Sequence, residues 1–185
     1  MRMKWIMNKH KKKFIIIDMV LLVIFALIDQ VSKFYIVNNL SLPTKESIVI
    51  IPDVLELRYQ ENYGGAWGIL ENQLFFFVAV TSIIAMIIVY LIIKMPNDKK
   101  YNMFHIALAM MMSGALSNLA DRLMNGYVID FIYFKAIQFP IFNLADVFVT
   151  ISAIILLFLF FFIYKEDDLN FLNMKQKKYR EIKYK

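Results

Sequence analysis

LFFFVAVTSIIAMIIVYLIIKM, residues 74–95, is apolar over almost its whole length. A helix needs about 20 predominantly apolar residues to cross the hydrocarbon core of a bilayer. Three further stretches, 14–37, 101–124 and 141–164, have comparable length and character. We therefore expect an all-α integral membrane protein with four transmembrane helices.

The composition of the 185-residue chain supports this class. Hydrophobic residues make up 60% of it and the mean hydropathy is +0.56, whereas a soluble domain of this size needs more polar surface. The apolar stretch that begins at Phe14 is longer than the core of a signal peptide, and no A-x-A cleavage site follows it, so we interpret it as a retained helix. The chain contains no cysteine, which excludes disulfides, thiol nucleophiles and cysteine-ligated metals.

Lysine and arginine are distributed unevenly along the chain. They are dense in residues 1–13, 94–100 and 165–185 and sparse in 38–73 and 125–140. By the positive-inside rule, both termini and the middle loop are cytoplasmic and the two sparse segments face outward. Anchoring at the membrane surface also accounts for the net charge of +6, which we prefer to nucleic-acid binding as its explanation.

The charge pattern and the apolar spans divide the chain into three parts. We expect a basic cytoplasmic N-terminus over 1–13, a four-helix membrane domain over 14–164 and a charged cytoplasmic tail over 165–185. Neither an internal repeat nor a low-complexity linker interrupts the membrane domain.

The first outward segment carries two local signals. VLELRYQ, residues 54–60, alternates apolar and polar side chains, which is typical of a strand. It predicts a small extracytoplasmic β-sheet between helices 1 and 2. NYGGAWG, residues 62–68, fits both a tight turn with an interfacial aromatic anchor and a binding role.

Ionisable side chains occur inside the spans, where each costs about 2.5 to 3.5 kcal/mol at a helix centre. Asp29 and Lys33 are spaced i, i+4 and can form a scaffold ion pair on one helix face. Asp121 and Arg122, near the end of the third span, can form a similar structural pair. Asp18 is the exception at the inner end, where we expect a hydrated or lysine-paired role.

Two aspartates differ from these because neither has a basic neighbour at helical spacing. Asp130 lies in the connection 125–140, and Asp146 lies in the first turns of the fourth span. Two carboxyl groups brought together in a poorly hydrated site share one proton, because like charges at close range cannot both ionise cheaply. This is the arrangement of an aspartic protease, in which one acid polarises the carbonyl and the other activates water.

Other hydrolytic sites fit the sequence poorly. His10 and His105 lie toward the cytoplasmic side, away from the outward carboxylates, and Ser32 and Lys33 are adjacent rather than one turn apart.

Two alternatives stay open. An ion-coupled transporter would also bury such groups, but it needs polar groups in both leaflets, and the inner half has almost none. A non-catalytic lipid- or peptide-binding membrane protein is the second.

Five motifs together resemble one enzyme family. They are DQVSK (29–33), NYGGAWG (62–68), GALSNLADR (114–122), VIDF (128–131) and FNLAD (142–146). Their order, spacing and positions in the spans resemble the lipoprotein signal peptidases, or signal peptidase II, which are aspartic peptidases of family A8. The resemblance covers residues 14–164. A single motif would be a weak signal, whereas five in register with the topology are specific.

The resemblance implies a membrane-embedded aspartic endopeptidase. It would cleave the signal peptide from diacylglyceryl-modified prolipoproteins, immediately before the lipidated cysteine, near the outer leaflet of the bacterial cytoplasmic membrane. Inhibition by the cyclic peptide globomycin and a monomeric state are further expectations, with prolipoproteins and membrane lipid as partners and no nucleic acid. No metal or organic cofactor is indicated.

The resemblance also implies roles for particular residues. Asp130 and Asp146 correspond to the catalytic dyad. The residues that would bind substrate or support the site are Asp29, Lys33, Asn62, Gly64, Ala66, Gly114, Asn118, Asp121, Arg122, Asn143 and Ala145. Two positions depart from the usual pattern: Ser117 stands where the family usually has glycine, and Ser113 replaces a frequent Gly or Ala. Serine is small, so we expect close helix packing to survive.

Overall fold

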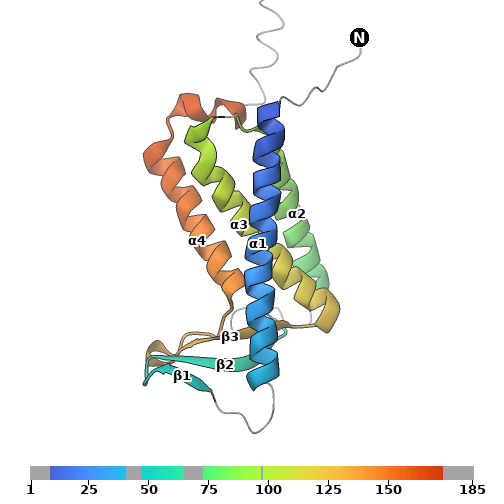
Figure 1. Cartoon of the computed structure of the whole chain (residues 1–185), viewed down its shortest axis with the longest axis vertical. Coiled ribbons are helices and arrows are strands. Elements are labelled where there is room, and N and C mark those ends of the chain that lie inside the picture. The colour runs from blue at the N-terminus through green and yellow to red at the C-terminus, as the bar shows by residue number, and fades with distance from the viewer. Residues whose placement is uncertain (1–8, 41–46, 65–72, 97, 173–185) are drawn as a thin grey trace, which may run out of the picture.

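The computed structural model describes residues 9–40, 47–64, 73–96 and 98–172. Within these residues, four helices are long and apolar enough to cross a membrane, and they stand side by side in Figure 1. They are α1 (Lys9–Leu40), α2 (Leu74–Lys94), α3 (Asn102–Asn125) and α4 (Leu144–Phe158), the last continued by a π-helical turn, η4 (Leu159–Ile163). The predicted four-helix membrane architecture is confirmed.

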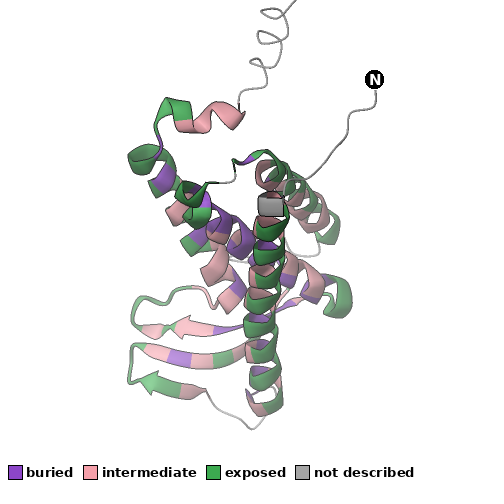
Figure 2. Cartoon of the chain, turned by 45° about the horizontal axis from the view of Figure 1, so that its top comes forward, coloured by how far each residue is buried: buried purple, intermediate pink, exposed green. Residues whose placement is uncertain are grey.

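Helix α3 occupies the middle of the bundle and packs against α1, α2 and α4. Ala107 on α3 is fully buried, whereas Phe75 on α2 is 84% exposed. Figure 2 shows the same contrast, with exposed residues along the outer face of α1. Apolar side chains that face outward along a whole helix are expected where the surroundings are lipid rather than water.

An antiparallel sheet lies at one end of the bundle, beside the last turns of α1 (Figure 1). Its three strands are β1 (Ile48–Ile51), β2 (Leu55–Asn62) and β3 (Val128–Phe134), and they lie in the order β1-β2-β3. The strand predicted from VLELRYQ is therefore confirmed as β2. The third strand was not predicted, because only Asp130 interrupts an otherwise apolar segment and no alternation marks a strand.

The sheet places Asp130 next to the first outward segment. In the β2–β3 register, Gln60 lies opposite Asp130 and Asn62 lies opposite Val128. The sheet is also continued toward α4 by a bridge between Ile132 and Phe142. Strand β3, which follows α2 and α3 in the sequence, is thus held beside β2, which precedes α2.

Helices α3 and α4 approach closely at Gly114. A Cβ atom added there would lie 2.5 Å from the carbonyl oxygen of Ala145, a main-chain atom. Glycine is required because any side chain would push the two backbones apart. Helix α3 ends one residue before Gly126, whose φ of 85° is the left-handed conformation that commonly terminates helices.

Two apolar clusters enclose the polar residues of the bundle. One lies at the end opposite the sheet and contains Tyr101, Phe104, Leu108, Leu159 and Tyr164. The other joins α1 to the sheet and contains Ile36, Leu40, Ile129 and Phe131. The buried charged residues of α1 and α3 lie in two places: Asp29, Lys33, Asp121 and Arg122 lie toward the sheet end, and Asp18 lies toward the opposite end.

Candidate active site

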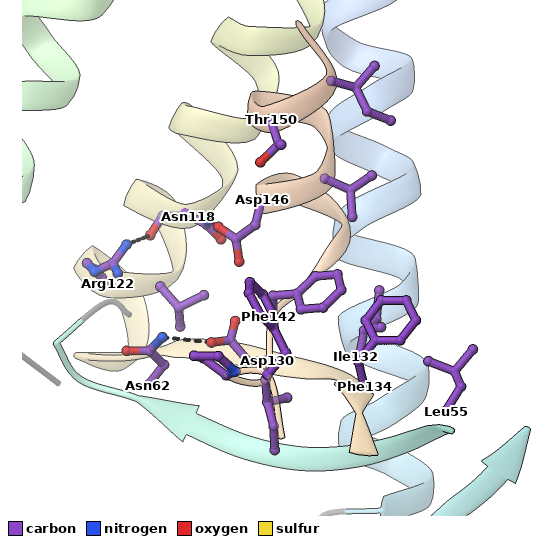
Figure 3. A pocket seen from close by; sticks show the side chains of 16 residues that line it. Leu55, Asn62, Asn118, Arg122, Asp130, Ile132, Phe134, Phe142, Asp146 and Thr150 are labelled. Atoms are coloured by element: carbon purple, nitrogen blue, oxygen red, sulfur yellow. Dashed lines mark hydrogen bonds between the residues drawn. The ribbon is translucent and has the colours of Figure 1, made fainter. Parts of the chain in front are cut away.

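A cavity of about 720 Å³ opens between α3, α4 and the sheet. Its polar lining consists of Asn62, Asn118, Arg122, Asp130, Asp146 and Thr150. The rest is largely apolar and includes Leu55, Ile132, Phe134, Phe139, Ile141 and Ile151. Figure 3 shows the carboxyl groups of Asp130 and Asp146 projecting into this space from β3 and α4. The structure therefore brings the two aspartates that were singled out in the sequence into one cavity.

Asp130 is 1% exposed, and both of its carboxyl oxygens accept hydrogen bonds. Asn62 Nδ2 donates to Oδ2 at 2.7 Å, and Asn143 Nδ2 donates to Oδ1 at 2.6 Å. Burial, and after it the charge of Asp146, raise the pKa of Asp130 to about 7 against the opposing effect of the two amide donors. This carboxyl group can therefore carry a proton near neutral pH.

Asp146 is held by the start of its own helix. Asn143 precedes α4 and forms a capping box with Asp146: its Oδ1 accepts from Asp146 N at 2.9 Å, and its own N–H donates to Asp146 Oδ2 at 3.2 Å. Asn118 Nδ2 donates to the other oxygen at 2.8 Å. Asn143 thus contacts both aspartates, and its fully buried side chain fixes their relative position.

A buried ion cluster lies behind the cavity. Lys33 Nζ is 2.7 Å from Asp29 Oδ2 and 2.7 Å from Asp121 Oδ2, and all three residues are at least 97% buried. The same ammonium group donates to Asn118 Oδ1 at 2.9 Å. Because Asn118 in turn holds Asp146, the cluster is connected to the cavity through one side-chain amide. The predicted Asp29–Lys33 contact is confirmed.

Asp29 also joins α1 to α3 and α4. Its Oδ1 accepts from Ala145 N at 2.8 Å, and its Oδ2 accepts from Ser117 Oγ at 2.6 Å. Gln30 Nε2 donates to Ser117 Oγ at 2.9 Å and to Asp121 Oδ1 at 2.8 Å. The hydroxyl group of Ser117 therefore adds contacts that glycine could not make. Gln30 was missed in the sequence, although it lies within DQVSK beside Asp29.

The expected pairing of Asp121 with Arg122 was wrong. Adjacent helical residues point about 100° apart, so Asp121 turns toward Lys33 while Arg122 turns toward the cavity. The guanidinium group of Arg122 lies 3.8 Å from the ring centre of Phe77, and its Nη1 donates to Asn118 O at 3.2 Å. Its Nε finds no hydrogen-bond partner among the described residues. Phe77 is a neighbour of the site that no motif indicated.

The remaining predicted residues support the frame of the site. Gly64 is buried and its N–H donates to Asn62 Oδ1 at 3.0 Å, which orients the amide that holds Asp130. Gly114 and Ala145 form the close contact between α3 and α4. Ala66 lies outside the described residues. No group of three or more His, Asp or Glu side chains that could hold a metal occurs in the described part of the chain.

Asp18 differs from the expectation of a hydrated or lysine-paired group. It is 5% exposed and its Oδ2 lies 2.8 Å from His105 Nδ1, near the bundle end opposite the sheet. The i, i+4 pattern could not find this contact because it joins α1 to α3. The half of the bundle away from the sheet is therefore not devoid of polar groups, which removes one sequence argument against a transporter.

Comparison with known proteins gives an independent result. Residues 20–162 match the family Signal peptidase (SPase) II. Lipoprotein signal peptidases of Staphylococcus aureus strains JH9 and Newman are each 38% identical over 151 residues, covering 80% of this chain and 90% of theirs. Two solved structures described as bacterial membrane enzymes are also similar. One has a TM-score of 0.67 with 33% identity, covering 77% of this chain and 86% of the other. The second has a TM-score of 0.66 with 34% identity, covering 80% and 94%.

Proposed function

The chain belongs to the signal peptidase II family, the aspartic peptidases that cleave signal peptides from prolipoproteins, and on this premise we propose that Asp130 and Asp146 are its catalytic dyad. The observation that carries the proposal is the bridge through Asn143, which contacts both carboxyl groups at the wall of one cavity. No other pair of carboxyl groups lines that cavity among the described residues.

The dyad would act with one proton shared between its two carboxyl groups. The ionised acid removes a proton from a water molecule, whose oxygen attacks the scissile carbonyl carbon, while the protonated acid donates to the carbonyl oxygen. The tetrahedral intermediate collapses when the C–N bond breaks and the proton taken from water passes to the leaving amine, while the acid that protonated the carbonyl oxygen takes a proton back from a hydroxyl group of the intermediate. The pKa of Asp130, raised to about 7 by burial, supports a singly protonated pair at neutral pH.

The neighbouring side chains would position these acids rather than react. Asn62, Asn118 and Asn143 hold the carboxyl oxygens in place. The cluster around Lys33 fixes Asn118 and ties α1 to α3. Arg122 presents its guanidinium group to the cavity, where it can donate to a carbonyl oxygen of a bound peptide.

The substrate we propose is a diacylglyceryl-modified prolipoprotein, cut immediately before the lipidated cysteine. The apolar walls of the cavity support this, because acyl chains and the apolar part of a signal peptide need such surfaces. The dyad lies at the sheet end of the bundle, so the scissile bond would be cut at the edge of the membrane rather than at its centre.

The orientation in the membrane follows from the distribution of basic residues. We place the sheet outside and both termini in the cytoplasm, with 1–13 and 165–185 flanking a membrane domain of 14–164. The described lysines at the bundle end opposite the sheet support this: Lys11, Lys12, Lys13, Lys94, Lys99, Lys100 and Lys165. Because one chain supplies the whole proposed site, a monomer is sufficient for activity.

A cleavage assay on a diacylated precursor tests the dyad. Asp130→Asn and Asp146→Asn should each abolish the shift of the precursor band while the protein still inserts and folds. Glu166→Gln, at an exposed residue, is the matched control and should cleave normally, with inhibition by globomycin. Near-normal cleavage by either aspartate variant would refute the assignment.

A further inference from the structure

A second cavity, of about 680 Å³, lies at the bundle end opposite the sheet. It is formed by the first turns of α1 and by the start of α3 with the 3-10 turn η2 (Lys99–Tyr101) before it. Its polar lining includes Lys13, Asp18, Lys99 and His105. No residue of this inner cavity also lines the cavity of the dyad, so the catalytic proposal does not account for it.

Asp18 is the unusual group of the inner cavity. Its Oδ2 contacts His105 at 2.8 Å, but its Oδ1 has no hydrogen-bond partner within residues 9–40, 47–64, 73–96 and 98–172. A buried carboxyl oxygen without a donor is costly, so native structures usually provide one from protein, water or ligand. Asp18 lines the cavity but its Oδ1 is itself buried, so a ligand bound there can supply that donor once the carboxyl group rotates toward it.

The mouth of the inner cavity is basic and its walls are apolar. Lys13 and Lys99 are exposed, and neither forms an ion pair with a described residue. Ile17 and Leu21 lie one and two turns further along α1 and continue the lining toward the middle of the bundle. A ligand that fits this order has an anionic group at the mouth, a hydrogen-bond donor facing Asp18 and an apolar portion along α1.

We propose that the inner cavity binds an anionic glycerophospholipid with a hydroxylated headgroup, such as phosphatidylglycerol. Its phosphate accepts hydrogen bonds from Lys13 and Lys99, a headgroup hydroxyl donates to Asp18 Oδ1, and an acyl chain lies along Ile17 and Leu21. Basic pockets between transmembrane helices are typical sites for anionic headgroups. A choline headgroup fits poorly, since it has no hydroxyl or N–H donor and carries a positive charge toward two lysines.

Native mass spectrometry of the full chain in detergent tests the proposal without any peptide substrate. Phosphatidylglycerol should be retained in preference to phosphatidylcholine. A double variant, Lys13→Gln with Lys99→Gln, should lower that retention about tenfold. The matched control is Lys12→Gln with Lys165→Gln, which removes the same charge from exposed residues outside the inner cavity and should leave retention nearly unchanged.

A second comparison isolates the contact with Asp18. Phosphatidylmethanol has the same charge as phosphatidylglycerol but no headgroup hydroxyl, so the unmodified protein should retain it less well, and Asp18→Ala should remove the difference. If Asp18→Ala does not fold, the comparison of phosphatidylglycerol with phosphatidylmethanol in the unmodified protein tests the contact with Asp18.

Three results would overturn the proposal. They are equal retention of phosphatidylglycerol and either other lipid, equal loss in the two lysine double variants, and displacement of the lipid by inorganic phosphate, which would indicate a small-anion site. None of them would affect the assignment of the dyad, which is tested by cleavage.

Discussion

Replacing Gly114 by alanine tests whether the close approach of α3 and α4 sets the geometry of the dyad. The added Cβ would lie 2.5 Å from Ala145 O and 2.9 Å from Val149 Cγ2. The first contact is with main chain, so a side-chain rotation cannot relieve it. Reaching an ordinary contact of 3.4 Å requires the helices to separate by about 0.9 Å, because packed interiors have little free space.

Such a separation would break a contact of the dyad. Asn118 on α3 donates to Asp146 on α4 at 2.8 Å, and this distance would grow to about 3.7 Å, beyond hydrogen-bonding range. We expect overpacking to cost about 1–3 kcal/mol of stability. Misplacement of a reacting group by roughly 1 Å should lower turnover by about 100-fold.

Thermal unfolding in detergent and single-turnover cleavage would be measured together on Gly114→Ala. Gly126→Ala is the control, because its φ of 85° disfavours alanine while, its two chain neighbours aside, no atom of the described residues lies within 4 Å of the added Cβ. The control should lose about 1–2 kcal/mol of stability yet keep its rate per folded molecule. Wild-type turnover in Gly114→Ala would refute the argument that this contact positions the dyad.

Three further predictions follow from the same contacts. Cleavage should fall about tenfold per pH unit once the pH exceeds the raised pKa of Asp130, which is about 7, because the shared proton is then lost. Asn62→Ala should move this alkaline limb to higher pH, since the Asn62 amide lowers that pKa; an unchanged limb in the pH–rate profile would contradict the role of Asn62. Lys33→Met should cost about 3–5 kcal/mol in a melting experiment, because two buried carboxylates lose their cation, and adding Asp29→Asn should restore part of it; a double variant no more stable than the single one would count against the cluster. Asp29→Ala should have a larger effect on stability, measured by melting, than on turnover per folded molecule. A larger loss of turnover than of stability would indicate that Asp29 takes part directly in the chemistry.

The sequence alone was sufficient for the class of protein, its four spans and the identity of the candidate aspartates. Apolar runs predict spans because the free energy of transferring a segment into lipid is close to the sum of the contributions of its residues. The contact of Asp29 with Lys33 was predictable for a similar reason, since both residues lie on one helix at i, i+4. Strand β2 was recognisable because apolar and polar residues alternate along its sequence.

Only the tertiary structure decided which distant residues meet. It paired Asp121 with Lys33 rather than Arg122, joined Asp18 to His105, and added residues 128–134 to the sheet as β3. These contacts depend on how one helix is rotated against the next and on the β2–β3 register. Neither the rotation nor the register produces a repeating pattern within the sequence of one segment, so sequence periodicity could not predict them. The bridge of Asn143 to Asp130 has the same origin: α4 and β3 must be packed together before one amide can reach both carboxyl groups.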